Sequence, residues 1–199
     1  MQIRKAKIED TPNIVNYMML AMQDIVYKFI GEENDEKATQ FLTNLVGRKG
    51  DQYSYENCWI AEIDGEDVGA AVVYDGGKLH ELRDPVIQEI KKMTGRNYCP
   101  EDETQAGEFY IDCVGVSPNH QGKGIGSKIF RFLIDEYVYN RGESLGLLVD
   151  KDNQGAKKLY LKLGFEIVGE QELAGKEMEK MQYKCIKASM EWKCFDLKI

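Results

Sequence analysis

The sequence predicts an α/β fold in which helices flank a central, mixed and mostly antiparallel sheet. Two patterns lead to this prediction. In the first half of the chain, Asp64 and Gly65 join two apolar strands and give a strong two-residue hairpin signal. In the second half, a strand breaks into a glycine-dense loop and an amphipathic helix, and helices and strands continue to alternate after it. At 199 residues the chain suits one domain, which we place at residues 1–199.

Composition narrows the classes of function. The net charge of -8 disfavours nucleic acid as a partner, because its phosphates require a concentrated basic surface, and favours a cationic substrate such as an amine. Five widely spaced cysteines, without a Cys-x-x-Cys pair, indicate reduced thiols rather than a disulfide framework or a metal site. No apolar run approaches the length of a membrane span, so we expect a cytoplasmic protein without a membrane partner.

The first quarter of the chain predicts one strand and two helices. Residues 3–8 alternate between polar and apolar side chains, as a half-buried strand does. Asp10 or Thr11 can then cap an amphipathic helix that Gly31 stops, and a second helix ends at Gly47. The turn between these helices is acidic, and it either attracts a cationic substrate or is a solvated loop.

The middle of the chain predicts a hairpin and an insertion. The hairpin strands span residues 53–63 and 66–74, and we expect them at the centre of the sheet. Residues 76–107 are a charged insertion between strands, with a short helix that Asp84 caps and Gly95 ends. Such an insertion can select the substrate or cover a sheet edge, and both roles stay open.

The last part of the chain predicts two further strand and helix units. A strand at residues 108–116 precedes the glycine-dense loop and its helix, and a short strand follows at residues 145–150. Asn153 can cap the next helix, which Gly164 ends. Residues 169–199 form a variable C-terminal part, helix-permissive at first and alternating at its end. A last strand there would allow two chains to pair as a homodimer.

The glycine-dense loop is suited to bind a phosphate. The first N–H groups of a helix have no partner within it, and the helix dipole adds positive potential. Three glycines remove the Cβ atoms that would hold a diphosphate away from the backbone. We therefore expect a nucleotide-like cofactor at residues Gln121, Gly122, Lys123, Gly124, Ile125, Gly126 and Ser127.

Two better-known phosphate loops fit this segment poorly. A Walker A loop requires Ser or Thr directly after Gly-Lys, whereas Gly124 follows Lys123. The Rossmann fingerprint requires its third glycine two residues further on than Gly124 and Gly126 allow. A dinucleotide-dependent enzyme is therefore an alternative that the glycine spacing disfavours.

Two segments resemble the GNAT superfamily of N-acetyltransferases. Gln121, Gly124 and Gly126 match its acetyl-CoA loop, Gln/Arg-x-x-Gly-x-Gly/Ala. A second segment matches its Asn-x-x-Ala-x-x-Leu-Tyr-x-x-x-Gly-Phe pattern at Asn153, Ala156, Leu159, Tyr160, Leu163, Gly164 and Phe165. The resemblance implies a single-domain GNAT-like fold in which splayed strands form an acetyl-CoA groove, with acetyl-CoA as co-substrate and no metal.

The resemblance also implies roles in cofactor binding. The main chain of Val114 and Val116 would pair with the pantetheine arm as an added strand does, and Gly115 is where the strand would bulge to open the groove. An N–H near Val114 would face the thioester oxygen as charge develops on it, a type of contact worth about 3 kcal/mol. Asn153 would hydrogen-bond the cofactor arm between the strands, and Lys123 either adds charge or is solvated.

Catalytic roles follow from the same comparison. Tyr160 matches the superfamily tyrosine that protonates the leaving thiolate, which a phenol with a pKa near ~10 can do. The superfamily commonly places a carboxylate base on the strand before the loop. We rank Glu108 before Asp112 for this role, with Tyr110 lining the site. Cys113 is expected to be a core thiol.

The sequence therefore predicts an acyltransferase that moves an acetyl group from acetyl-CoA to an amine by direct transfer in a ternary complex. The acceptor is a small molecule or an amino group of a peptide or protein. The alternative is a module of the same fold that binds acetyl-CoA or CoA as a sensor without turnover.

Overall fold

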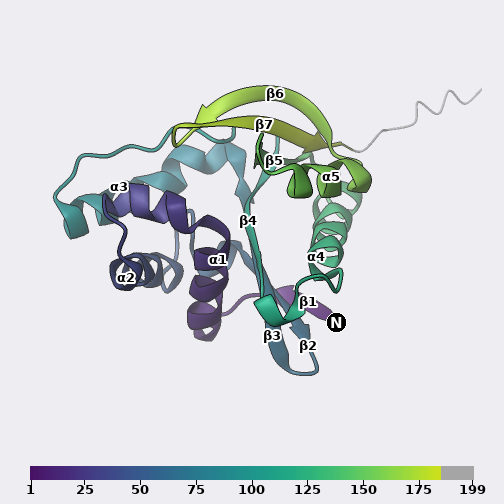
Figure 1. The fold of residues 1–199 in the computed structure, drawn as a ribbon, viewed down its shortest axis with the longest axis horizontal. Coiled ribbons are helices and arrows are strands. Elements are labelled where there is room, and N and C mark those ends of the chain that lie inside the picture. Colours follow the sequence, from purple (N-terminus) through teal and green to yellow (C-terminus); the bar gives the residue numbers. More distant parts are fainter. Residues whose placement is uncertain (185–199) are drawn as a thin grey trace, which may run out of the picture.

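The computed structural model describes residues 1–184, and within this range the strands form a single open sheet (Figure 1). The strand order is β1-β2-β3-β4-β5-β7-β6. Their bounds are β1 (Gln2–Lys5), β2 (Cys58–Ile63), β3 (Glu66–Asp75), β4 (Phe109–Val116), β5 (Leu145–Asp150), β6 (Glu166–Leu173) and β7 (Lys176–Tyr183). Neighbouring strands are antiparallel except for β4 and β5, which are parallel. The predicted mixed and mostly antiparallel sheet is confirmed.

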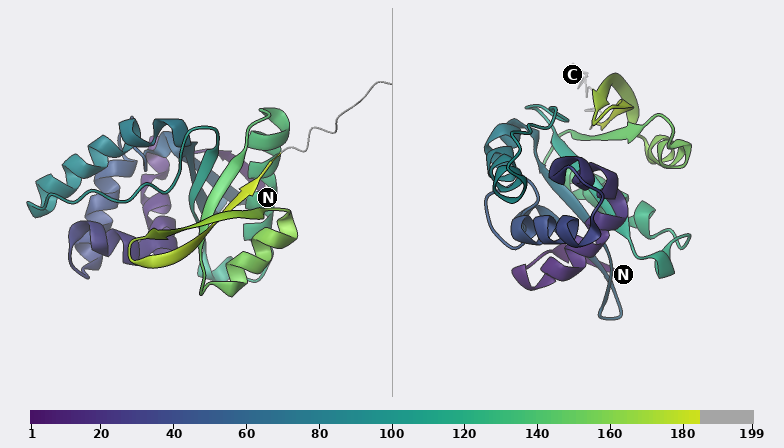
Figure 2. Two further views of the ribbon diagram at one scale, coloured as in Figure 1. Left: turned by 90° about the horizontal axis from the view of Figure 1, so that it is seen from above. Right: turned by 60° about the vertical axis from the view of Figure 1, so that its left-hand side comes forward.

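Helices cover both faces of this sheet (Figures 1 and 2). Their bounds are α1 (Thr11–Ile30), α2 (Asp35–Val46), α3 (Leu79–Thr94), α4 (Ile125–Leu133), which continues as a π-helical segment (Ile134–Asn140), and α5 (Gln154–Leu163). One apolar core lies between α1–α3 and the sheet, and a second lies between the sheet and α4 and α5. None of the helices in the described part of the chain is both long and apolar enough to cross a membrane.

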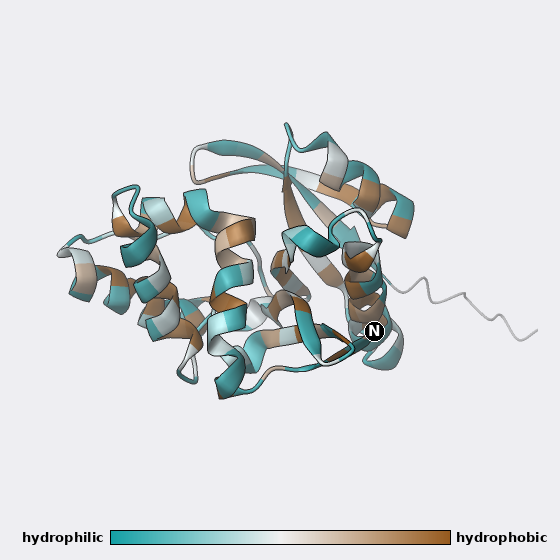
Figure 3. Cartoon of the chain, turned by 60° about the horizontal axis from the view of Figure 1, so that its bottom comes forward, coloured by the Kyte–Doolittle hydropathy of each residue, from teal (hydrophilic) through white to brown (hydrophobic). Residues whose placement is uncertain are grey.

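The helices alternate between hydrophobic and hydrophilic residues along their length (Figure 3), and the hydrophobic residues supply the two cores. Apolar side chains of α1 and α4 face the sheet, with Met18 and Ile129 almost completely buried. The β6 strand at the sheet edge is mostly exposed.

The predicted helix ends coincide with residues in the left-handed region. Gly31 has φ of 80°, Gly95 of 72° and Gly164 of 102°, a conformation that glycine adopts without strain. Asp64 and Gly65 have φ of 52° and 83°, as a tight hairpin turn of two residues requires.

Two helices differ from the prediction, one in its start and one in a kink that was not predicted. The insertion helix α3 begins at Leu79 rather than at Asp84, so Pro85 lies inside it. Leu79 and Val86 are both buried, and their packing holds the helix together across the proline, which lacks an N–H. Helix α1 contains a kink at Met22, where φ is -141°.

The strand boundaries also differ in two places. Residues 53–57 form turns and a short 3₁₀ segment, so the first hairpin strand begins at Cys58. The first part of residues 169–199, which was expected to permit a helix, instead belongs to the β6–β7 hairpin. The turn of this hairpin is Ala174 and Gly175. Strand β7 pairs with both β5 and β6, and this pairing outweighs local helix propensity. The expected last strand lies outside the described residues.

Strands β4 and β5 diverge after a short paired stretch. They pair only from Phe109 to Ile111 on β4, and β4 continues to Val116. Next to this divergence, β3 pairs Val73 with Ile111 and Val72 with Cys113, so Asp112 is an extra residue in β4. The bulge therefore lies at Asp112, and its prediction at Gly115 was wrong.

Gly115 has a different role. It pairs regularly with Ala70, and a Cβ at this position would lie 2.1 Å from the carbonyl oxygen of Tyr17. Glycine is required there because α1 crosses β4 in direct backbone contact.

Candidate active site

A large cleft occupies the space where β4 and β5 diverge. Its volume is about 940 Å³. It is walled by α1, β4, β5, α5 and the β6–β7 turn, and α2 contributes Asp35 and Thr39 at one end. Val114 lines the cleft from β4, on a segment that has no β5 partner. The backbone of this segment is therefore available to an extended ligand on its β5 side.

Asn153 and Tyr160 reach the cleft from α5. Asn153 caps the helix, since its side chain accepts the Ala156 N–H at 3.1 Å. Tyr160 packs on Phe130 and Phe165, with ring centroids 4.9 Å and 6.1 Å away. Its hydroxyl makes no hydrogen bond to another residue in the range 1–184. Burial raises the pKa of Tyr160 to about 12, so the phenol is protonated at neutral pH.

The glycine-dense loop lies ahead of α4 and exposes bare backbone. Gly122 and Gly124 have φ of 74° and 76°, and Gly124 is the N-cap of the helix. Apart from the adjoining residues and the backbone of the same helix, no heavy atom of the described residues lies within 4 Å of the position that a Cβ would take at Gly122, Gly124 or Gly126. The Gln121 side chain turns back to donate to the Val116 carbonyl at 3.4 Å. The loop has the open backbone and the helix N-terminus that a diphosphate requires.

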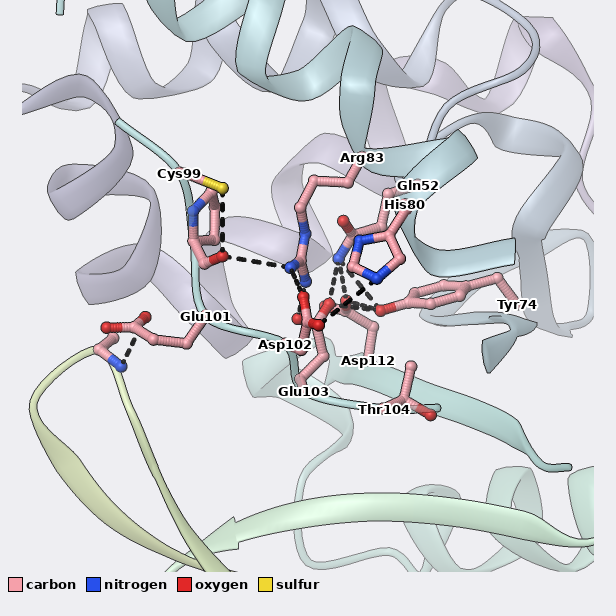
Figure 4. A network of polar contacts seen from close by, with 12 residues as sticks. Gln52, Tyr74, His80, Arg83, Cys99, Glu101, Asp102, Glu103, Thr104 and Asp112 are labelled. Carbon is pink, nitrogen blue, oxygen red and sulfur yellow. Dashed lines mark hydrogen bonds and ion pairs between the residues drawn. The ribbon is translucent and has the colours of Figure 1, made fainter. Parts of the chain in front are cut away.

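Asp112 lies at the inner end of the cleft, placed by the bulge in β4. Its Oδ2 accepts from Gln52 Nε2 at 2.9 Å and from Tyr74 Oη at 3.2 Å (Figure 4). The same two donors reach Glu103 Oε1, at 2.6 Å and 2.5 Å. Two carboxylates thus share one set of neutral donors.

This arrangement raises the pKa of Asp112 to about 7. Burial is the main cause, and the charge of Glu103 adds to it, while the bonds from Gln52 and Tyr74 act in the opposite direction. Tyr53, Tyr110 and Cys113 also face this carboxylate, and their own pKa values are raised by burial first and by its charge second. A carboxylate with a pKa near neutrality is suited to take a proton from an amine.

Arg83 of α3 holds Glu103 from the other side. It forms an ion pair with Glu103 and a second with Asp102 at 2.7 Å, and donates to the Pro100 carbonyl at 3.2 Å (Figure 4). Its Nε has no hydrogen-bond partner among the described residues. The insertion therefore supplies both the carboxylate that raises the pKa of Asp112 and the guanidinium that lowers it.

Glu108 lies outside the cleft, and its side chain is buried among polar partners. Its side chain is 1% exposed and forms an ion pair with Lys180 of β7 at 2.6 Å. It also accepts from Thr104 at 2.8 Å and from Gln182. Gly146 is required opposite it, because a Cβ there would lie 2.3 Å from the carboxylate. All of these partners fix Glu108 as part of the β4–β5–β7 core.

Comparison with known proteins decides the family. The model of the Acetyltransferase (GNAT) family matches residues 22–165, which is more than half of the chain. The chain belongs to the GNAT acetyltransferase family.

Solved structures of GNAT proteins share the whole fold. A crystal structure described as an acetyltransferase is 29% identical, with a TM-score of 0.76 over 92% of this chain and 99% of that one. An N-acetyltransferase from Staphylococcus aureus Mu50 is 21% identical, with a TM-score of 0.80 over 92% of this chain and all of that one. Because the Staphylococcus aureus protein is only 21% identical, its similarity concerns the fold alone.

Curated GNAT relatives match over shorter segments. The N-alpha-acetyltransferase RimI of Mycobacterium tuberculosis is 40% identical over 62 residues, which is 31% of this chain and 37% of that protein. Across the curated relatives that it matches, the chain spans half of their length or less.

The structure brings together some of the predicted GNAT site residues and separates others. Asp112, Val114, Asn153 and Tyr160 line one cleft, whereas Glu108 does not. Gly115, Val116 and all of the predicted loop residues 121–127 lie outside the cleft lining. Cys113 packs against the α1–α3 core, on the opposite side from Val114 as expected, but it is only partly buried and also lines the cleft, so it is not solely a core thiol.

Sequence reasoning missed the residues around Asp112. Glu103, Arg83 and Gln52 carry no motif. Gln52 bonds both Asp112 and Glu103, and Arg83 pairs with Glu103. The only signal was the unusual length and charge of the insertion.

Proposed function

We propose that this protein transfers an acetyl group from acetyl-CoA to an amine in a ternary complex, with Asp112 as general base and Tyr160 as general acid. The observation that carries the proposal is that a carboxylate with a raised pKa and a free phenol line the same cleft, beside an unpaired strand edge. An acid and a base that line the same cavity can both contribute to direct transfer.

The residues present are suited to hold acetyl-CoA. The bare backbone of Gly122, Gly124 and Gly126 offers N–H donors for the diphosphate. The free edge of β4 at Val114 offers main-chain groups to the pantetheine amides, and Asn153 lies on the opposite wall. When bound, acetyl-CoA supplies the reactive thioester.

Asp112 is our choice over Glu108 for the base. Glu108 is engaged by Lys180 and lies outside the cleft, whereas Asp112 lines the cleft and has only neutral hydrogen-bond donors. An ionised Asp112 takes the proton that an incoming ammonium must lose before its nitrogen can attack.

Tyr160 supplies a proton on the other side of the reaction. Its hydroxyl makes no hydrogen bond to another residue in the range 1–184, and its pKa of about 12 keeps it protonated at neutral pH, so it can donate a hydrogen bond to the leaving thiolate. An N–H near Val114, on the part of β4 without a β5 partner, would stabilise the oxyanion.

Two measurements test the proposal. Titration calorimetry with acetyl-CoA is expected to give binding, and free-thiol detection is expected to report CoA release with at least one primary amine. Binding without release across a broad amine panel would favour a sensor module and contradict the transferase. Thermal stabilisation by NAD instead of acetyl-CoA would contradict both.

A further inference from the structure

A small side chamber opens from the cleft beside Asp112. The two cavities share the lining residues Met22, Ile25, Asp112, Leu173 and Ala174. The chamber volume is about 40 Å³. At roughly 10–15 Å³ for one water-sized group, it holds about three to four such groups. A ligand whose reacting atom lies beside Asp112 can therefore place a short chain in this chamber.

The insertion builds one wall and the β6–β7 turn closes the chamber. Tyr98, Pro100, Glu101 and Glu103 belong to the extended part of the insertion, residues 95–107. The insertion and the hairpin touch through Ala174, whose N–H donates to Glu101 at 3.4 Å. A second contact joins Gln171 Nε2 to the Asp102 carbonyl at 3.1 Å.

The chamber lining combines carboxylates with aromatic rings. The lining contains three carboxylates, Glu101, Glu103 and Asp112, and one basic residue, Arg83. This arginine is already paired with Glu103 and Asp102. The aromatic lining residues are Phe29, Tyr53, Tyr98 and Tyr110. The Phe29 and Tyr98 rings lie 6.0 Å apart. Carboxylates and ring faces both stabilise an organic cation, and they disfavour a carboxylate.

We propose that this chamber is an acceptor-selecting site that binds a second ammonium group, so that the preferred acceptor is a short diamine whose two nitrogens are separated by about three carbons. The inference rests on the proposed acetyl transfer for the reacting nitrogen, which lies beside Asp112. The second nitrogen lies between Glu101 and the aromatic rings. The amine bond to the acetyl carbon forms as the thioester C–S bond breaks, and the proton passes to Asp112.

The competing occupant is a group that accepts hydrogen bonds. Arg83 Nε lacks a partner among the described residues, and it would favour a hydroxyl or carboxylate end group. A panel of amines that differ only at the far end separates these cases: 1,3-diaminopropane, propylamine, 3-amino-1-propanol and β-alanine.

Two readouts on the full chain distinguish the two proposals. Titration of each amine into the protein with CoA reports acceptor binding without turnover, and thiol release with acetyl-CoA reports transfer. We expect 1,3-diaminopropane to bind at least tenfold more tightly than propylamine, and β-alanine to bind most weakly. Selective binding without thiol release would support the chamber and contradict the transferase. Equal binding of the diamine and propylamine, or preference for β-alanine or the amino alcohol, would overturn the chamber.

A matched pair of variants assigns the selectivity to the insertion. Glu101→Gln, at an exposed position on the chamber rim, is expected to lower the ratio of diamine to propylamine affinity by about fivefold to tenfold. Glu172→Gln removes an exposed carboxylate of β6 that lines neither cavity, and it should keep the ratio. An unchanged ratio in Glu101→Gln, with the same melting temperature as the wild type, would overturn the role of the insertion.

Discussion

Two carboxylates near the start of β4 have opposite environments. Glu108 is buried against Lys180, with Thr104 and Gln182 as further donors. Asp112 is half-buried in the cleft, with neutral donors and a second carboxylate, Glu103, as its neighbours. Lys180 compensates the buried charge of Glu108, whereas the surroundings of Asp112 disfavour a charge on it. Position near the start of β4 therefore does not decide whether a carboxylate is paired with a cation or lies beside a second carboxylate. Partners from distant segments decide this.

Asp112→Asn is expected to have the largest effect on activity. Loss of the general base should lower kcat by about 10²–10³-fold, measured as thiol release at pH 8. The fold should be retained, because an amide oxygen can accept from Gln52 and Tyr74. A kcat within tenfold of the wild type would remove Asp112 from the mechanism.

The same variant has a stability signature. The pKa of Asp112 in the folded chain, about 7, lies above its ordinary value of 3.8, so ionisation costs stability as the pH rises from about 4 to 7. Asp112→Asn removes this cost. Its melting temperature relative to the wild type should therefore be higher at pH 8 than at pH 5, which scanning fluorimetry can measure.

Tyr160→Phe tests the acid on the opposite wall of the cleft. We expect kcat to fall by tens-fold, since the leaving thiolate loses its proton donor, and the acetyl-CoA dissociation constant to change little. Tyr139→Phe, on a tyrosine outside the cleft, is the control. A large loss of acetyl-CoA affinity without a change in kcat would assign Tyr160 to binding.

Glu108→Gln should affect stability more than chemistry. The substitution leaves Lys180, whose side chain is 14% exposed, without its anion, and breaking a buried ion pair in this way costs about 3–5 kcal/mol. Urea unfolding would measure the loss. Wild-type stability combined with a hundredfold lower kcat would reverse the roles of the two carboxylates.

Glu103→Gln should have the smallest effect on activity, a displacement of the pH profile, although it should also lower stability because it removes one anion from the buried Arg83. Activity of the wild type should rise with pH through a midpoint near 7, as Asp112 loses its proton. Removing the charge of Glu103 lowers the pKa of Asp112, so the midpoint should move to lower pH. Asp102→Asn, next to it on the same segment, is the control. An unmoved midpoint in Glu103→Gln would show that the two carboxylates do not interact.

The sequence was sufficient wherever local chemistry sets the structure. Helix ends at Gly31, Gly95 and Gly164 follow from glycine conformation, and the cleft positions of Asn153 and Tyr160 follow from a motif on one helix. The order of Glu108 and Asp112 could not be predicted, because Lys180 and Glu103 approach β4 from segments without a recognisable pattern. The bulge at Asp112 is likewise set by pairing with β3, which no local signal encodes.

The contacts of Gln171 with the Asp102 carbonyl and of Ala174 with Glu101 link the β6–β7 hairpin to the insertion. These two segments are far apart in the chain, and neither one encloses the chamber alone. The insertion and the hairpin must therefore be replaced together when the preference for the acceptor amine is to be changed. A chimera that takes the insertion from a relative must also take the matching hairpin tip, since a mismatched pair would leave the chamber open to water.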